Sequence, residues 1–249
     1  MTAIPEGIAM GRRKLVALTI WSLLGFAALI ALGTWQIQRL HWKEKLIAER
    51  QSAIAAAPVT LPRSLEAARG LDFHRVSASG TFVREREFYV YATERESGDA
   101  GVLVVTPLRL DDGATVMVER GWIPNERRAR VPVDPGRVTV DGLLRLPPRG
   151  KPGWFVPDNE PARNQWFYID IAAMARAGGI AETLPFYIEA GPTPNPGVYP
   201  RGGQANTDLP NNHLQYAITW YALAATLAII YFLVLRRERD AARTEGETS

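Results

Sequence analysis

The chain has 249 residues, no cysteine and three histidines, and its formal net charge is +3 at pH 7. Without cysteine there is no disulfide, thiolate-ligated iron–sulfur cluster or thiol nucleophile, and three histidines argue against a multi-histidine metal cluster. Basic and acidic residues are interspersed, a distribution that does not indicate nucleic-acid binding.

A hydrophobic run near the N-terminus predicts a membrane-spanning helix. Residues 15–36 carry no charge and follow the basic cluster Arg12–Lys14. A signal peptide begins in the same way, but this run is longer than a typical signal core, and no convincing small-residue cleavage site closes it. Trp35 and Trp42 lie near basic residues at its far end, as in the aromatic belt of a membrane interface. We therefore expect residues 1–14 to precede a retained transmembrane helix at 15–36.

A second apolar run lies near the C-terminus. Residues 213–235 contain no acidic residue, lysine or arginine, and this length is enough to cross a bilayer as a helix. Basic residues lie before the first run and after the second, so the positive-inside rule places both termini in the cytoplasm. Residues 37–212 then form an external domain, and residues 236–249 form a cytoplasmic tail.

The external domain reads as an α+β domain in which strands dominate. Short β-rich stretches lie at 74–83, 87–93, 101–110, 115–123, 137–146 and 186–190. Helix formers continue the first helix through 42–57 until Pro58 stops it. Short helices are expected at 63–70 and at 170–177, the second closed by two glycines. We expect the strands to form a compact antiparallel sheet or a partial barrel.

Three connecting stretches carry turn or loop signals. Asp111-Asp112-Gly113 predicts a hairpin turn between two of the strands. Pro147–Gly153 is rich in proline and glycine and predicts a loop. Residues 165–170 are expected to be a short strand or an extended piece.

Motifs for catalysis are missing from the sequence. No serine lies in a nucleophile elbow, and there is no phosphate-binding glycine loop of the Walker or dinucleotide type. The paired carboxylates Asp111 and Asp112 are explained by turn chemistry. We therefore predict that the chain is not an enzyme.

The stretch Glu119–Pro124 allows two interpretations. In the first, the strand turns sharply at Gly121, Trp122 packs into the core and Arg120 finds a carboxylate partner, because glycine within a strand marks a bulge or a close approach. In the second, Arg120, Gly121 and Trp122 form a surface that docks a partner protein.

His213 also allows two interpretations. On a helix, His213, Tyr216, Ala217 and Trp220 share one face. An imidazole at the lip of a membrane helix above aromatic rings could present an axial ligand to a haem. The same arrangement could anchor a helix at the lipid interface with no cofactor.

Three motifs in order resemble the surfeit locus protein one family, whose members assist assembly of haem–copper cytochrome c oxidase. The motifs are Gly33–Gln36 with Arg39 and Trp42-Lys43, Val118–Pro124, and Asn211–Ala217 with Thr219-Trp220. The resemblance spans nearly the whole chain, and it implies an assembly factor that binds haem a and passes it to the catalytic subunit.

The resemblance also implies a role for His213, which would be the residue that ligates the haem iron. Helix positions then place Tyr216, Trp220 and Trp35 around it. Arg39 at the end of the first helix could pair with haem propionates. His41, which is outside the family motifs, is a geometrically possible second ligand.

The expected partners are cytochrome c oxidase subunit I or its assembly intermediate, haem a synthase and membrane lipid. The segment before Arg12 lacks an arginine- and serine-rich transit peptide, which favours a bacterial plasma membrane with a periplasmic domain. Two alternatives remain: a haem-independent scaffold for an oxidase intermediate, and a membrane-anchored enzyme.

Overall fold

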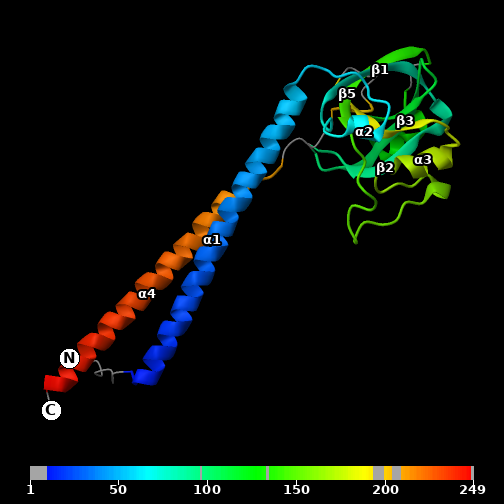
Figure 1. The fold of residues 1–249 in the computed structure, drawn as a ribbon. Helices are drawn as coiled ribbons and strands as arrows, with labels where there is room; N and C mark the ends of the chain where they lie inside the picture. Colours follow the sequence, from blue (N-terminus) through cyan, green and yellow to red (C-terminus); the bar gives the residue numbers. More distant parts are fainter. Residues whose placement is uncertain (1–9, 96, 133–134, 193–198, 204–208, 248–249) are drawn as a thin grey trace. The chain divides into compact units, whose positions relative to one another are not determined.

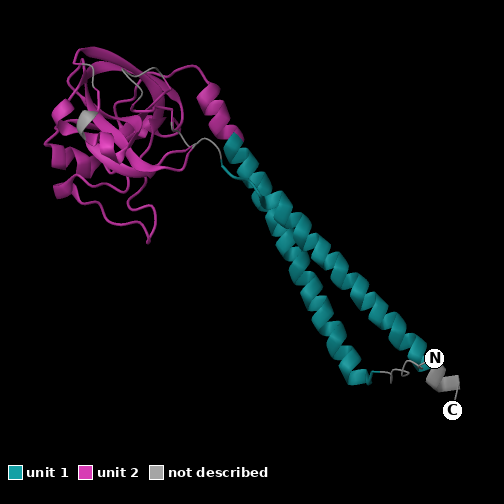
Figure 2. Cartoon of the chain, turned by 180° about the vertical axis from the view of Figure 1, so that it is seen from behind, with its two compact units in different colours: residues 1–47, 208–249 teal, residues 48–207 magenta. Residues whose placement is uncertain are grey.

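The computed structural model describes residues 10–95, 97–132, 135–192, 199–203 and 209–247. It divides into two compact units, which Figure 2 colours separately: residues 1–47 with 208–249, and residues 48–207. The helices are α1 (Arg12–Ala55), α2 (Leu65–Ala68), α3 (Ile171–Gly178) and α4 (His213–Glu247) (Figure 1). The strands are β1 (Arg75–Phe82), β2 (Phe88–Thr93), β3 (Ala100–Leu110), β4 (Thr115–Pro124), β5 (Arg137–Arg145) and β6 (Thr183–Ala190).

The first unit is built from α1 as far as residue 47 and from α4. Both helices are long and apolar enough to cross a membrane. The most apolar stretches have mean hydropathies of 2.4 in α1 and 2.1 in α4, and they bury almost nothing within the protein. A core helix of a soluble protein would be mostly covered, whereas Trp21 is 73% exposed and Phe232 is 62% exposed. The predicted architecture of two apolar helices flanking a strand-rich domain is confirmed. The predicted limits of the membrane spans at 15–36 and 213–235 stay predictions.

Small residues and hydroxyl contacts join α1 to α4, which lie side by side in both views (Figures 1 and 2). Gly33 of α1 is buried, as are Ala217 and Ala224 of α4. Tyr231 Oη donates a hydrogen bond of 2.8 Å to Thr19 Oγ1. Small side chains allow helices to approach closely, which is how helix pairs pack in lipid.

Three predicted helix ends are confirmed. α1 runs without a break to Ala55, three residues before Pro58, and so includes the helix-forming stretch beyond the apolar run. α3 begins at the N-cap Asp170, whose carboxylate accepts a hydrogen bond from Ala173 N at 2.9 Å. It ends at Gly179, which has a φ of 61°, a left-handed conformation that glycine adopts without steric cost.

The second unit is a six-stranded sheet that curls back on itself. The strand order is β1-β5-β6-β4-β3-β2, and β1 also pairs with β3, so that five strands close into a barrel and β2 extends from its edge. All pairs are antiparallel except β4 with β6. The structure therefore agrees with a barrel-like sheet, and the parallel pair departs from the all-antiparallel sheet offered as one expectation. The predicted turn is present, with Gly113 N donating to Leu110 O at 3.0 Å.

Alternate residues of the strands supply two hydrophobic clusters, as the two-residue period of a strand requires. Val116 and Val118 of β4 belong to one cluster, together with Leu108, Leu144 and Phe186. Met117 lies between them and belongs to a second cluster with Trp166 and with Met174, which is a residue of α3. The helix α3 and the segment before it, which contains Trp166, therefore cover the face of the sheet to which Met117 contributes.

The extended segment predicted at 165–170 is not a strand of the sheet. Trp166 makes an isolated bridge to Val90 of β2, where Tyr91 N donates to Trp166 O at 2.7 Å. The next amides bind a side chain instead, because Asn159 Oδ1 accepts from Phe167 N at 2.8 Å and from Tyr168 N at 3.4 Å. A side-chain acceptor thus replaces the strand ladder, a competition that composition alone does not reveal.

Candidate functional site

His213 begins α4, and its ring contacts α1. His213 Nδ1 lies 2.7 Å from Gln36 Oε1, across 177 residues of sequence. An amide oxygen only accepts hydrogen bonds, so the neutral tautomer that suits this contact has its proton on Nδ1 and its lone pair on Nε2. Gln36 is 9% exposed, so its amide is held in the helix pair.

The residues next to this contact hold the two helices close together. A Cβ on Gly33 would lie 2.7 Å from the ring of Tyr221, so the tyrosine packs directly on the backbone of α1. Tyr221 Oη also lies 3.2 Å from Thr34 Oγ1. Lys43 Nζ donates to Pro210 O at 2.5 Å, which fixes the approach of the chain to α4. The His213–Gln36 contact therefore lies beside a closely packed part of the interface between α1 and α4.

The predicted site residues and their neighbour Ala217 differ in how far they are buried in the first unit. Ala217 is buried and Trp220 is half-buried, whereas Tyr216 is 56% exposed and Trp35 is 50% exposed. Arg39 is exposed, and its guanidinium lies 4.3 Å from the ring centre of Trp42.

His41, the predicted possible second ligand, is exposed on α1. The structure thus pairs His213 with Gln36. Sequence reasoning missed Gln36 as a site residue, although it is a polar residue in an apolar run and belongs to the first quoted motif.

The contact between His213 and Gln36 fits the way in which metal-ligating histidines are oriented. Histidines that ligate metals usually donate their other ring N–H to a protein acceptor, which sets the tautomer and the ring orientation. Gln36 Oε1 occupies that position at His213 Nδ1. Among the described residues, no group of three or more His, Cys, Asp or Glu side chains is placed to hold a metal ion.

In the second unit, Arg120 is the extra residue of a β-bulge in β4. Val104 of β3 pairs with Gly121, while Val105 pairs with Glu119, so Arg120 has no partner in the strand register. Gly121 has a φ of 126°, and a Cβ there would lie 2.1 Å from Arg201 O. Both conditions require glycine. The expected bulge and close approach at Gly121 are present, but β4 continues through them to Pro124 and does not turn sharply.

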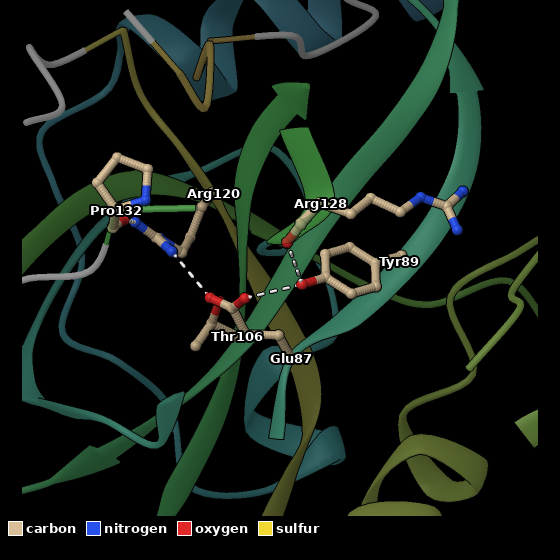
Figure 3. Close-up of polar contacts among 6 residues, drawn as sticks. All are labelled: Glu87, Tyr89, Thr106, Arg120, Arg128 and Pro132. Atoms are coloured by element: carbon tan, nitrogen blue, oxygen red, sulfur yellow. Dashed lines mark hydrogen bonds and ion pairs between the residues drawn. The ribbon is translucent and has the colours of Figure 1, made fainter. Parts of the chain in front are cut away.

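The bulge directs Arg120 into a buried polar network (Figure 3). Its guanidinium forms an ion pair of 3.1 Å with Glu87 and also donates to Pro132 O. Glu87 accepts from Tyr89 Oη at 3.1 Å. Burial, and then the charge of Glu87, raises the pKa of Tyr89 to about 12.

Trp122 is also buried, at 3% exposure, and its ring contacts Tyr199 with a centroid distance of 6.1 Å. Its indole N–H has no acceptor among the described residues. Arg120 and Trp122 are therefore held inside the domain, as the first interpretation of this stretch described. Their predicted part in docking a partner stays a prediction.

A second buried charged group lies on β4, β5 and β6, and sequence reasoning did not find it. Glu119 and Glu189 are paired in register, and each is 5% exposed. Arg145 forms ion pairs with Glu189 and with Asp72. Burial and then the charge of Glu189 raise the pKa of Glu119 to about 8. Glu119 within a hydrophobic strand is the signal that could have revealed this group.

An enzyme would need such carboxylates to face a substrate cleft. A groove in the second unit is lined by Pro147 and Pro148 on one side and by Ile171 and Ala175 of α3 on another. Glu119 and Glu189 do not line it. The groove and the two carboxylates with raised pKa values are therefore separate features.

Comparison with known proteins places the chain in a family. The model of the SURF1 family matches residues 23–225. Surfeit locus protein 1 of Rattus norvegicus is 37% identical over 236 residues, covering 85% of this chain and 74% of the rat protein. The human Surfeit locus protein 1 is 38% identical over 221 residues, covering 81% of this chain and 72% of the human protein. A SURF1-like protein of Monosiga brevicollis is 37% identical, with 86% of each chain covered.

The matched range contains the helix contact of His213 with Gln36 and the β4 bulge at Arg120. It also includes part of the apolar stretch of each long helix. A match of this extent, with relatives well above 30% identity, shows that the chain belongs to the SURF1 family.

Proposed function

We propose that this protein is an assembly factor for haem–copper cytochrome c oxidase, which binds haem a through His213 and assists its insertion into the catalytic subunit. Membership of the SURF1 family supports a role in oxidase assembly. The observation that carries haem binding is the contact of His213 Nδ1 with Gln36 Oε1 at 2.7 Å. In the neutral tautomer with the proton on Nδ1, Nε2 would offer its lone pair to iron at the end of an apolar helix.

His213 would hold haem a through its imidazole, and the haem would supply an iron that accepts a histidine nitrogen. Gln36 holds the imidazole in the tautomer that offers this nitrogen, and Gly33 and Tyr221 keep the two helices close enough for the contact. Arg39 on the exposed face of α1 is suited to pair with haem propionates. Trp35, Tyr216 and Trp220 are the aromatic neighbours that we propose for the ring.

A single protein ligand suits a carrier, because transfer requires release as well as binding. The protein would then act on haem without catalysing a reaction. Its proposed partners are subunit I of the oxidase or an assembly intermediate, and haem a synthase. We propose that Arg120, Gly121 and Trp122 shape the docking surface from beneath, because Arg120 and Trp122 are buried.

The test is the absorption spectrum of the full chain, purified in detergent from cells that make haem a. We expect the parent and the His41→Ala control to carry haem a, and His213→Ala to lose it. Gln36→Leu removes the acceptor but keeps the ligand, so we expect roughly 10–100-fold weaker haem retention, the usual effect of losing such a partner.

A His213→Ala variant that carries as much haem a as the parent would place the ligand elsewhere. If no variant carries haem a although cells contain it, the haem-independent scaffold is favoured. In that case His213→Ala would leave oxidase assembly intact, and changes at Gly121 or Trp122 would abolish it.

A further inference from the structure

Two adjacent aromatic side chains project from a loop of the second unit. Trp154 is 82% exposed and Phe155 is 80% exposed, and their ring centroids are 3.6 Å apart. Among the exposed large hydrophobic side chains of the described residues these two are the most exposed, above Trp21 of the apolar helix α1. We call residues 149–158 the aromatic tip.

The fold does not need aromatic residues at this position. Trp154 and Phe155 are the central residues of a turn in which Val156 N donates to Gly153 O at 3.2 Å. Such positions favour glycine, proline, asparagine, aspartate and serine, because these residues adopt turn geometry easily and stay hydrated. Both rings lie outside the hydrophobic clusters of the domain. Their presence therefore indicates contact with something outside the domain.

The base of the aromatic tip is held in place. Asn159 uses its side chain to bind the backbone of residues 167 and 168, with distances of 2.8 Å to Phe167 N and 3.2 Å to Tyr168 O. Lys151 Nζ forms an ion pair of 2.9 Å with Asp158 Oδ1. Proline at positions 147, 148, 152 and 157 restricts the backbone further. Ordering the tip against a surface therefore costs little conformational entropy.

The charge of the aromatic tip is positive. Arg149 is exposed, and Lys151 is balanced by Asp158, which is the only acidic residue of the tip. Cationic side chains beside tryptophan and phenylalanine match the boundary of an anionic bilayer, where rings occupy the headgroup region and cations meet phosphate.

We propose that the aromatic tip inserts into the headgroup boundary of a phospholipid bilayer that contains anionic lipid. The chain carries two helices able to cross a membrane, so the second unit is tethered to lipid at a high effective concentration. Two exposed aromatic rings and a cation are then enough for contact, although they would bind a membrane weakly by themselves. The contact would hold the second unit at a set orientation to the lipid surface.

The experiment uses the absence of cysteine from the sequence, since one introduced cysteine is then a unique label. The full chain with Phe155→Cys, carrying an environment-sensitive dye, is reconstituted in vesicles of phosphatidylcholine and phosphatidylglycerol. The control is Ala177→Cys, which is also exposed. We expect blue-shifted emission at position 155, with stronger quenching by a shallow spin-labelled lipid than by a deep one. Emission at position 177 should match that of the dye in water.

A second measurement avoids adding an apolar dye. Trp154→Phe removes one of seven tryptophans. Brominated lipid quenches part of the tryptophan emission, and the difference in this quenched part between the parent and the variant reports Trp154 alone. Arg149→Gln should weaken quenching in the anionic vesicles and have little effect in phosphatidylcholine alone.

Emission from position 155 that matches the control, with no lipid quenching of Trp154, would overturn the proposal. If the tip is water-exposed in vesicles and becomes shielded only when purified oxidase subunit is added, its partner is a protein and lipid insertion is wrong. Neither outcome depends on haem, so the proposed function is tested separately.

Discussion

Glu119 shows how the interior of the second unit changes the chemistry of a single residue. It lies beside Glu189 in a parallel pair of strands, and Arg145 is engaged with Glu189 and Asp72. Two buried carboxylates near one arginine cannot both ionise at low cost. Burial and then the charge of Glu189 raise the pKa of Glu119 to about 8, so the folded protein holds a proton there at neutral pH.

This shift predicts the pH dependence of stability. Below the usual pKa of 4.5 for this carboxyl, the folded and unfolded chains both hold the proton, and between 4.5 and about 8 only the folded chain does. The free energy of unfolding therefore falls as pH rises through this window. Glu119→Gln removes this titration. The free energy of unfolding of the variant, followed by thermal melting, should therefore decline less between about pH 5 and pH 8 than that of the parent. At the upper end of this range it should exceed the parent's value by roughly 1–3 kcal/mol.

Glu126→Gln is the matched control, because Glu126 is exposed and its replacement should leave the pH dependence unchanged. An equal decline in the parent and in Glu119→Gln would contradict the assignment of the held proton to Glu119.

At the scale of elements, the pairing of α1 with α4 depends on Gly33. A Cβ at this position would lie 2.7 Å from the ring of Tyr221, and the contacts Thr34–Tyr221 and Gln36–His213 follow within one turn of α1. A larger side chain at Gly33 would push the helices apart at the point where His213 is positioned. The site therefore relies on a residue that has no chemistry of its own.

Gly33→Leu tests this dependence. We expect the helices to separate and overpacking to cost roughly 1–3 kcal/mol, together with loss of haem retention. Spin labels at Ala31→Cys and Ala225→Cys, both exposed positions, report the separation by pulsed electron resonance. Ala27→Leu adds a leucine on an exposed face of α1 and should leave the distance unchanged. If Gly33→Leu leaves it unchanged too, close packing at Gly33 does not hold the pair.

The β4 bulge plays a similar part in the second unit. Gly121 brings the chain within reach of Arg201 O and frees Arg120 from the ladder. Arg120 then neutralises Glu87 in an interior position, a pair that is costly to break from either side. The presence of Arg120, Gly121 and Trp122 in this strand is thus explained first by folding. Any role of these residues in docking depends on the surface that this folding produces.

At the scale of the whole molecule, α1 and α4 decide on which side of a membrane the second unit lies. We expect both termini to lie in the cytoplasm, because basic residues lie before the first apolar run and after the second. A membrane-impermeant maleimide applied to spheroplasts should label Ser77→Cys of β1 directly. It should label Ala242→Cys of α4 only after permeabilisation, since both positions are exposed. Labelling in the opposite order would reverse the topology.

The sequence by itself determined the features that depend on local pattern. Uninterrupted apolar runs predicted the two long helices, because a bilayer span requires length and apolarity, and these are read directly along the chain. Stretches rich in β-forming residues, together with turn residues, predicted the six strands, and Asp170 and the paired glycines delimit α3. The three motifs identified the family before any geometry was known.

Only the tertiary structure decided which distant residues meet. Barrel closure by β1 and β3, and the parallel pairing of β4 with β6, depend on how strands far apart in sequence associate. The partner of His213 lies 177 residues away and the partner of Arg120 lies 33 residues away. Composition and periodicity describe a residue's immediate neighbours, whereas a hydrogen bond or a buried ion pair depends on packing that brings remote segments to within about 3 Å.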